Sequence, residues 1–262
     1  NSHELRTDES RVPEEEYVAA LIRDLESALQ DVWGRRLSSV FLGGGTPSLF
    51  SAGAMDAVLT AVRTLLPLEH FAEVTLEANP GTFEAQKFAD FRKAGINRLS
   101  IGIQSFNPQH LKALGRVHDD QEAHRAVDIA LKYFDNINLD LMYALPGQTL
   151  EHAQADIEAA CACGVTHISA YHLTLEPNTL FYRFPPKLPD DEAAAAMQDM
   201  IEQTTSDHQY RNYETSAFAR AGKESRHNVN YWLFGDYVGI GAGAHSKISF
   251  ADKIVRQMRY KQ

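Results

Sequence analysis

The chain has 262 residues, of which 44% are hydrophobic and 23% are charged, and its formal net charge is −10 at pH 7. This is an ordinary globular composition, long enough for one large α/β domain or for two smaller domains. The acidic balance and the lack of any dense basic patch argue against nucleic acid or an anionic membrane surface as the main partner.

The expected location follows from cysteine content and hydropathy. The two cysteines, Cys161 and Cys163, cannot form a disulfide framework. There is no apolar run long enough to span a bilayer and no signal peptide. We therefore expect a cytoplasmic protein that does not span a membrane. The sequence opens on Asn1 without a methionine and stops at Gln262 without a tail-like composition, so we expect both ends to be cut.

Hydrophobic periodicity predicts alternating helices and strands over the first two thirds of the chain. The expected elements, in order, are helix 14–33, strand 39–42, helix 52–66, strand 72–78, helix 82–94, strand 98–104, helical segments 110–114 and 120–133, strand 136–141, helix 150–163 and strand 167–175. Strand and helix alternate at βαβ spacing, which predicts an α/β fold with a parallel sheet and right-handed crossovers.

The pattern changes after residue 184. A proline-rich connector covers residues 184–189, and an alanine-rich helix is expected over residues 190–205. A single strand is predicted over residues 210–217. Segments 226–232 and 239–245 follow, without an assigned secondary structure.

A glycine loop directly follows the first predicted strand. The run Gly43-Gly-Gly-Thr-Pro47 lies between that strand and a helix. Glycine alone offers bare N–H groups and positive φ without steric cost, so three in succession favour a loop that a ligand approaches closely. A plain strand-to-helix turn is the alternative.

Polar side chains lie at the carboxyl ends of the later strands. Glu77, Gln104 and Asp140 each interrupt an apolar or β-branched run, and a carboxylate there is costly unless it is paired or meets a ligand. Parallel sheets and barrels bind ligands beyond these ends, which predicts one shared site. The alternative is a structural ion pair, such as Asp140 with Arg116.

These residue types suit a nucleoside-like ligand with an amino-acid moiety. A carboxylate accepts hydrogen bonds from ribose hydroxyls or an ammonium, and the Arg116 guanidinium matches a carboxylate. Neither a GxGxxG dinucleotide motif nor a GxxxxGK[ST] phosphate loop occurs in the chain. S-adenosylmethionine therefore fits the chemistry at least as well as NAD.

Further motifs carry a family resemblance that runs over nearly the whole chain. They are GGGTPS at 43–48, EANP at 77–80, SIGIQSF at 100–106, LGRVH at 114–118, NLDLMYALPG at 138–147 and HNVNYW at 227–232. The chain resembles the radical S-adenosylmethionine (radical SAM) enzymes of the oxygen-independent coproporphyrinogen III oxidase group, and especially their haem-chaperone branch.

The resemblance implies a partial (β/α)6 TIM-like barrel with adenosylmethionine across the strand ends. It implies a barrel core over residues 1–184 and a helix and strand extension over residues 185–262 that leads into a missing C-terminal domain. The residues that match the family's adenosylmethionine contacts are Gly44, Gly45, Thr46, Glu77, Gln104, Arg116 and Asp140.

The chain departs from the family in its cysteines. The family binds a [4Fe–4S] cluster through a CxxxCxxC motif, which is absent here. We expect the first strand and the cluster loop to precede Asn1 in the full-length protein. Cys161 and Cys163 lie two residues apart in a predicted helix and do not share a face, so we expect them to pack rather than to bind metal.

The HNxxYW motif is the signature of the haem-chaperone branch, which is described as holding haem through it. It places His227 as a possible iron ligand and Tyr231 and Trp232 as apolar faces for a porphyrin, with Asn228 between them. From the residues alone, a buried structural motif is an equal alternative. The resemblance favours haem.

The remaining histidines receive ordinary interpretations. His172 is assigned no role, and His245 is either a second residue beside the haem or part of a structural turn. The histidines expected to be exposed are His118, His124, His152 and His208.

The resemblance predicts that the protein is a haem chaperone. Such a protein would bind adenosylmethionine and a [4Fe–4S] cluster and pass haem to haem-requiring proteins such as respiratory enzymes. The alternative is a coproporphyrinogen III oxidase that performs an oxidative decarboxylation. A cluster-free binding protein is the third hypothesis. No catalytic residue is assigned.

Overall fold

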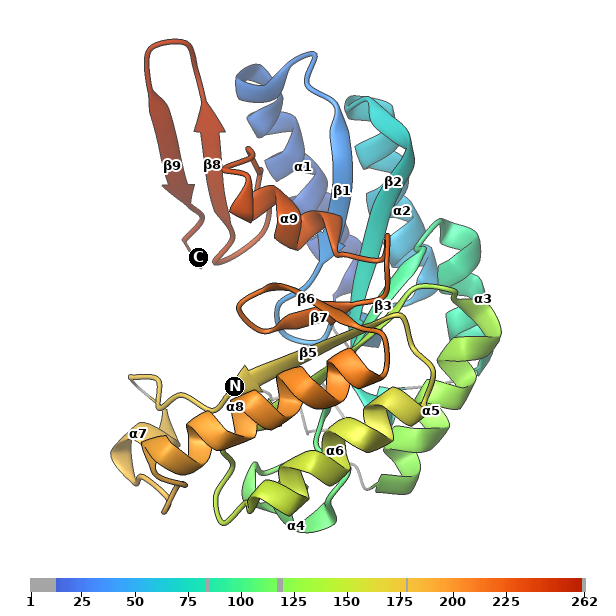
Figure 1. Cartoon of the computed structure of the whole chain (residues 1–262). Helices are drawn as coiled ribbons and strands as arrows, with labels where there is room; N and C mark the ends of the chain where they lie inside the picture. The colour runs from blue at the N-terminus through green and yellow to red at the C-terminus, as the bar shows by residue number, and fades with distance from the viewer. Residues whose placement is uncertain (1–12, 83–84, 117–119, 178, 261–262) are drawn as a thin grey trace. The chain divides into compact units, whose positions relative to one another are not determined.

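The computed structural model describes residues 13–82, 85–116, 120–177 and 179–260 (Figure 1). It divides the chain into two compact units that interleave along the sequence. The first contains residues 1–76, 86–97 and 225–262, and the second contains residues 77–85 and 98–224.

The first unit contains a parallel strand pair backed by helices. Strands β1 (Leu37–Leu42) and β2 (Leu68–Ala78, which continues into the second unit) pair with Val40 opposite Val74. The helices are α1 (Glu14–Val32), α2 (Ala52–Leu65) and α3 (Ala85–Ala94), with a 3₁₀ turn at Pro47–Leu49.

The pleat of β1 separates its neighbours onto two faces. Val40 packs into an apolar cluster that contains Val32 of α1 and Val62 of α2. Phe41 points to the opposite face, where its ring stacks on His227 of helix α9 (Arg226–Trp232). The same strand therefore contributes to the core on one side and supports the HNxxYW motif on the other.

The unit closes with an antiparallel hairpin of β8 (His245–Ser249) and β9 (Ile254–Met258). Asp236 anchors its approach by accepting hydrogen bonds from Ser249, Lys247 and Arg35. Burial raises the pKa of Asp236, but these hydrogen bonds outweigh burial and hold the pKa well below the usual range of a carboxyl group.

The second unit contains a mixed sheet in the order β3-β4-β5-β7-β6. Strands β3 (Arg98–Gln104), β4 (Ile137–Tyr143) and β5 (His167–His172) are parallel, and β7 (Ala217–Ala219) runs antiparallel to both β5 and β6 (Arg211–Glu214). The unit also holds a 3₁₀ turn at Pro80–Thr82 and, in chain order, helices α4 (Pro108–Ala113), α5 (Asp120–Tyr133), α6 (Leu150–Ala162), α7 (Leu180–Arg183) and α8 (Asp191–Asp207).

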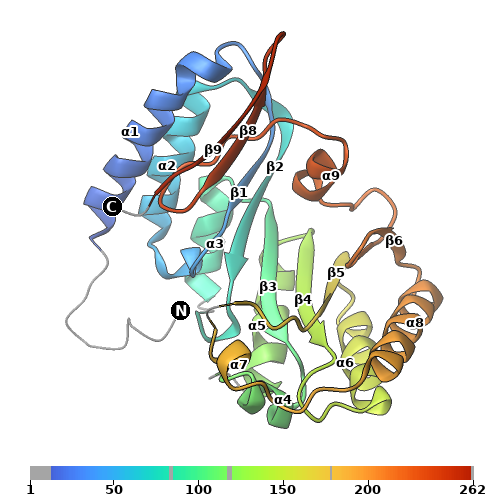
Figure 2. The same ribbon diagram turned by 90° about the vertical axis from the view of Figure 1, so that its left-hand side faces the viewer.

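The parallel strands of this unit have one apolar face and one polar face. Figure 2 shows β3, β4 and β5 side by side, with α5 and α6 nearby. The buried apolar positions are Leu99, Ile101, Ile103, Ile137, Leu139, Leu141, Ile168 and Ala170. The alternate positions point to the opposite face because successive side chains of a strand alternate. They are Arg98, Ser100, Asn138, Asp140, His167 and Ser169.

The predicted α/β fold with parallel strands is confirmed, and most elements lie within a few residues of their expected bounds. The single strand predicted over residues 210–217 is wrong: that stretch holds β6, a tight turn and the start of β7, because the apolar residues Ala217 and Phe218 pair back onto β6. Segment 226–232 forms helix α9. The boundary proposed between residues 184 and 185 stays a prediction. None of the described helices is long and apolar enough to cross a membrane.

The apolar face should dominate the stability of the second unit. Leu139 is fully buried at the centre of β4, so Leu139→Ala should lower the free energy of unfolding by about 2–5 kcal/mol through lost burial and the cavity left behind. Leu131→Ala, at a position on α5 that is 42% exposed, is the control and should cost about 1 kcal/mol or less. Urea denaturation measures both, and equal losses would contradict this assignment of the core.

Candidate functional site

The glycine loop begins where β1 ends and is exposed. Gly44 and Gly45 have φ angles of 80° and 64°, in the left-handed region where a side chain is strained, although no atom lies within 4 Å of a Cβ built at either residue. Backbone conformation, and not lack of space, therefore requires glycine here. Pro47 then opens the 3₁₀ turn, with half-buried Thr46 before it.

The end of β3 is strained at Gln104. Its φ is 68°, and the Ser105 N–H donates to the Ile103 carbonyl across it at 2.9 Å, which defines a γ-turn. Such turns with positive φ are rare and cost roughly 1–3 kcal/mol for a residue other than glycine. The pairing register of β3 with β4 also shifts between Ile101 and Gln104. Bulges and strain of this kind concentrate at functional sites.

Gly102 makes room for two amide side chains beside this turn. A Cβ at Gly102 would lie 2.9 Å from Gln104 Nε2 and 3.1 Å from Asn79 Oδ1. Asn79 comes two residues after half-buried Glu77, so the end of β2 and the end of β3 meet here within the second unit. The structure thus brings Gln104 close to the EANP motif that the sequence singled out.

A buried carboxylate fixes the loop after Gln104. Asp156 of α6 accepts hydrogen bonds from Ser105 Oγ at 2.6 Å and from the Phe106 N–H at 2.7 Å. Burial raises the pKa of Asp156, and these hydrogen bonds act in the opposite direction. Asp156 therefore pins the strained turn to the helical layer, a role that the sequence analysis missed.

Asp140 lies at the centre of a polar network on the inner face of the sheet. Its Oδ2 accepts from Ser100 Oγ and its Oδ1 accepts from Asn138 Nδ2, both at 2.8 Å. Burial raises the pKa of the Asp140 carboxyl, while these hydrogen bonds and the charge of Arg98 lower it. A carboxylate in this setting gains from a cationic ligand, because the ligand compensates the charge that burial disfavours.

The network continues beyond the residues predicted from sequence. Asn138 Oδ1 contacts His167 Nδ1 at 2.6 Å and accepts from Ser169 Oγ at 3.0 Å. His167 Nε2 lies 2.8 Å from the Tyr213 hydroxyl. The signal that would have revealed it is the alternation of polar residues along β3, β4 and β5, since every second residue shares a face.

Arg116 is exposed and follows Gly115 just after α4. Among the residues that the structure describes, no ion pair joins Arg116 to Asp140, so the alternative of a structural ion pair between them is wrong. Four predicted adenosylmethionine contacts, Glu77, Gln104, Arg116 and Asp140, belong to the second unit. The glycine loop belongs to the first unit.

The HNxxYW motif forms α9, which begins at the buried N-cap Ser225. The His227 ring is half-buried, stacked on Phe41 at 4.4 Å between centroids and edge-on to Tyr231 at 4.9 Å. Its backbone N–H donates to the buried Glu73 carboxylate at 3.4 Å. The structure therefore gives His227 packing contacts and leaves part of its ring accessible.

The end of α9 presents apolar surface. Trp232 is 57% exposed and is followed by Leu233 at 75% and Phe234 at 80%. Phe234 adopts a φ of 55°, and Lys247 Nζ donates to its carbonyl at 2.7 Å. A bulky residue held in the left-handed region while exposed gains no packing energy in return, which makes this apolar surface a candidate interaction site.

Other histidines and the cysteines lie elsewhere. His124 and His208 are exposed as predicted, whereas His118 lies outside the described residues. The exposure predicted for His152 is wrong: it is half-buried, with its Nδ1 3.3 Å from Nε2 of the buried His110, because α4 packs against the start of α6 there.

His172 and His245 are exposed. Cys161 is buried on α6, and burial raises the pKa of its thiol to about 11, which disfavours the thiolate needed for metal binding. Among the described residues, no group of three His, Cys, Asp or Glu side chains is placed to hold a metal ion.

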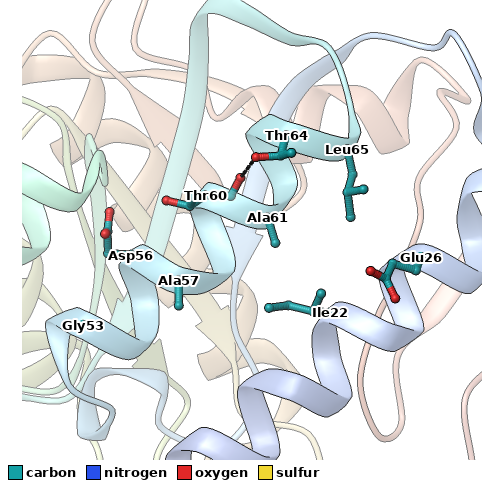
Figure 3. Close-up of a pocket in the computed structure, with 9 residues that line it drawn as sticks. All are labelled: Ile22, Glu26, Gly53, Asp56, Ala57, Thr60, Ala61, Thr64 and Leu65. Atoms are coloured by element: carbon teal, nitrogen blue, oxygen red, sulfur yellow. Dashed lines mark hydrogen bonds between the residues drawn. The ribbon is translucent and has the colours of Figure 1, made fainter.

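A shallow groove on the helical layer of the first unit has different chemistry. It runs between α1 and α2 and is lined by residues that include Ile22, Glu26, Asp56, Ala61 and Leu65 (Figure 3). It contains no histidine, cysteine or arginine and none of the family motifs. The groove therefore adds nothing to the predicted site.

Sequence comparisons match the chain to known proteins. Residues 8–160 match the profile of the Radical SAM superfamily. The chain is 49% identical over 253 residues to heme chaperone HemW of Escherichia coli (strain K12), covering 96% of this chain and 66% of that protein. It is 38% identical over 242 residues to heme chaperone HemW of Bacillus subtilis (strain 168), covering 90% and 64%. The chain thus spans about two-thirds of the length of such relatives.

Structural comparison identifies the same fold. Coproporphyrinogen III oxidase (HemN) from Escherichia coli, described as a radical SAM enzyme, superposes with a TM-score of 0.77 at 22% identity and covers 90% of this chain and 58% of its own. The archaeal Elp3 of Methanocaldococcus infernus superposes with a TM-score of 0.54 at 16% identity, covering 71% and 49%. The predicted partial barrel is confirmed as the fold type.

The polar network should make stability depend on pH through His167. Burial, and to a smaller extent the charge of Arg98, lower the pKa of His167 well below its ordinary value. Between the two pKa values the His167 side chain therefore binds a proton in the unfolded chain but not in the folded chain. The contribution of neutral His167 to the free energy of unfolding is therefore complete above about pH 6.5. It falls by about 1.4 kcal/mol per pH unit as the pH drops toward the folded pKa of His167.

Urea denaturation between pH 5 and pH 7.5 measures this slope. His167→Asn should remove that part of the slope, while His208→Asn at an exposed position should leave it unchanged. Equal slopes in the wild type and in His167→Asn would contradict the assignment.

Proposed function

Because the chain belongs to the radical SAM superfamily, we propose that it binds S-adenosylmethionine at the carboxyl ends of its strands and holds haem for delivery as a haem chaperone. The observation that carries this proposal is the identity to proteins named heme chaperone HemW over nearly the whole chain. The strained turn at the end of β3 and the polar network around Asp140 within the strands support the adenosylmethionine part of the proposal.

Each predicted contact residue has a chemical group suited to one part of adenosylmethionine. The backbone at Gly44 and Gly45, with the Thr46 hydroxyl, would hold the methionine moiety. Glu77 would accept the ribose hydroxyls or the ammonium, and Arg116 would pair with the carboxylate. When bound, the cofactor supplies the one-electron chemistry of the superfamily.

Two residues of the second unit would orient the cofactor. Gln104 offers an amide beside Gly102, and the γ-turn fixes the direction in which it points. Asp140 would balance the positive charge of the ligand, and binding would in turn favour its ionised form. Adenosylmethionine affinity should therefore increase as the pH rises through the raised pKa of Asp140.

The [4Fe–4S] cluster that the family implies does not fit the cysteines of this chain. Cys161 and Cys163 lie two apart at the end of α6, and burial raises the pKa of both thiols. Two such thiols do not make the three-cysteine loop of the family. No role in the chemistry of the cluster is assigned to them.

Haem would be held at α9. The exposed Trp232 offers a flat apolar face, the ring of Tyr231 packs on Tyr237, and the half-buried His227 would supply a ring nitrogen. Asn228 completes the motif. We infer that recipients are haem-requiring proteins such as respiratory enzymes, and that delivery takes place in the cytoplasm.

Less evidence supports the alternative function as a coproporphyrinogen III oxidase. The likeness to coproporphyrinogen III oxidase lies below 25% identity and therefore concerns the fold alone. No contact among the described residues favours decarboxylation of a porphyrinogen over binding of haem. The chaperone is the function that the chain supports best.

Gln104→Gly tests the adenosylmethionine site in a way that separates binding from folding. Glycine tolerates the φ of 68°, so the variant should be more stable by up to about 1 kcal/mol, yet adenosylmethionine should bind about tenfold more weakly without the amide. Calorimetric titration with adenosylmethionine measures affinity, and urea denaturation measures stability.

Gln209→Gly is the matched control. Gln209 has a φ of 66° at the end of α8, far along the chain from the strand ends, so the variant should gain stability without loss of affinity. Unchanged affinity in Gln104→Gly would remove Gln104 from the site.

His227→Phe tests haem ligation apart from packing. Phenylalanine can keep the stack on Phe41 but has no ring nitrogen, so the melting temperature should change little while the haem difference spectrum is lost. Trp232→Ala should weaken haem binding without changing the ligand spectrum, and Trp33→Ala, 80% exposed after α1, is the control for exposed tryptophan. A wild-type spectrum in His227→Phe would make His227 structural.

A further inference from the structure

The inner face of β3, β4 and β5 carries a chain of hydrogen bonds that crosses the sheet of the second unit. It starts at Asp140, passes through Ser100 and Asn138, and continues to His167 and then to Tyr213 on β6. The residues lie on neighbouring strands because Ser100 is opposite Asn138 and Asn138 is opposite His167 in the parallel register. Among the predicted adenosylmethionine contacts, only Asp140 takes part in this chain of hydrogen bonds.

When Asp140 is ionised, its carboxylate fixes the direction of every bond in this network. Asp140 only accepts, so the side-chain amide nitrogen of Asn138 must face it, and Asn138 Nδ2 also lies 2.8 Å from Ser100 Oγ. The carbonyl oxygen of Asn138 must then face the other way, toward His167 and Ser169. A flipped amide would place two acceptor oxygens 2.8 Å apart.

The orientation of Asn138 in turn selects the tautomer of His167. An acceptor lies 2.6 Å from Nδ1, so Nδ1 carries the proton and donates it. Neutral imidazole has only one N–H, so Nε2 accepts from the Tyr213 hydroxyl at 2.8 Å. His167 is fully buried, so water does not compete for either nitrogen.

We propose that His167 is a positioning residue for adenosylmethionine: as the Nδ1–H tautomer it locks the Asn138 amide, which together with Ser100 aims the Asp140 carboxylate at the ligand. This inference rests on the proposed adenosylmethionine site. It extends that site to residues that were not predicted to contact the ligand, of which His167 and Tyr213 lie outside all the family motifs. Supporting partners of this kind commonly change the affinity of a site by 10-fold or more.

The first arm of the test needs no ligand. Nitrogen-15 NMR of the histidine-labelled protein should show a protonated Nδ1 and a bare Nε2 for His167, assigned by the loss of its signals in His167→Asn. A protonated Nε2 would overturn the direction of the chain and with it the proposal.

The second arm compares adenosylmethionine dissociation constants by calorimetric titration of the protein and its variants. His167→Leu keeps most of the volume but removes the donor, and it should weaken binding about tenfold. His167→Asn places an amide nitrogen near the former Nδ1 and should restore affinity to within about threefold of the wild type. Tyr213→Phe removes only the far hydroxyl and should have the smallest effect.

Urea denaturation of every variant accompanies the titrations. If His167→Asn and His167→Leu are equally folded and equally weak, the donor does not matter and the proposal fails. If the wild type binds no adenosylmethionine, or Asp140→Asn binds as well as the wild type, the proposed site fails instead, whatever the tautomer of His167.

Discussion

The two-sided character of β3, β4 and β5 is the constraint on which the candidate site depends. One face, with Leu139 at its centre, is fully buried apolar surface. The other face carries charged and polar groups that are costly to bury unless they are hydrogen-bonded. The network around Asn138 satisfies Ser100, Asp140, His167 and Ser169, since the nitrogen and the oxygen of its amide each meet a partner on a neighbouring strand. These hydrogen bonds hold the Asp140 carboxylate in place on a polar face, where the proposed ligand would meet it, and apolar side chains do not occupy that face.

The fold was readable from the sequence where local patterns are strong. Helical periodicity and βαβ spacing predicted the parallel strands, because burial on one or both faces leaves a direct mark on composition. The hairpin of β6 and β7 and the hairpin of β8 and β9 were missed because their strands are short and pair antiparallel with distant or adjacent segments, which periodicity does not encode. Helix α9 was missed because its residues, such as His227 and Asn228, are polar or aromatic and carry no apolar stripe.

The candidate site was predictable at its strand ends and not beneath them. Gln104 and Asp140 stood out because polar residues interrupt apolar runs, although Asp140 lies in the middle of β4 and not at its end. The strain at Gln104 and its anchor on Asp156, fifty residues along the chain, depend on tertiary contacts that no local pattern reveals. Packing explains only part of the HNxxYW region. The stack on Phe41 accounts for a structural role of His227, whereas packing does not account for the exposed Trp232 or for the strained Phe234 that follows the motif.

The central claim is that the polar face of β3, β4 and β5 faces the cofactor. A crystal structure of the full-length protein with adenosylmethionine tests it most directly. The account predicts density for the ligand within hydrogen-bond distance of Gln104 Nε2 or Oε1 and of an Asp140 carboxylate oxygen, with the γ-turn at Gln104 retained. Ligand density that contacts neither residue, or a Gln104 that relaxes to negative φ on binding, would contradict it.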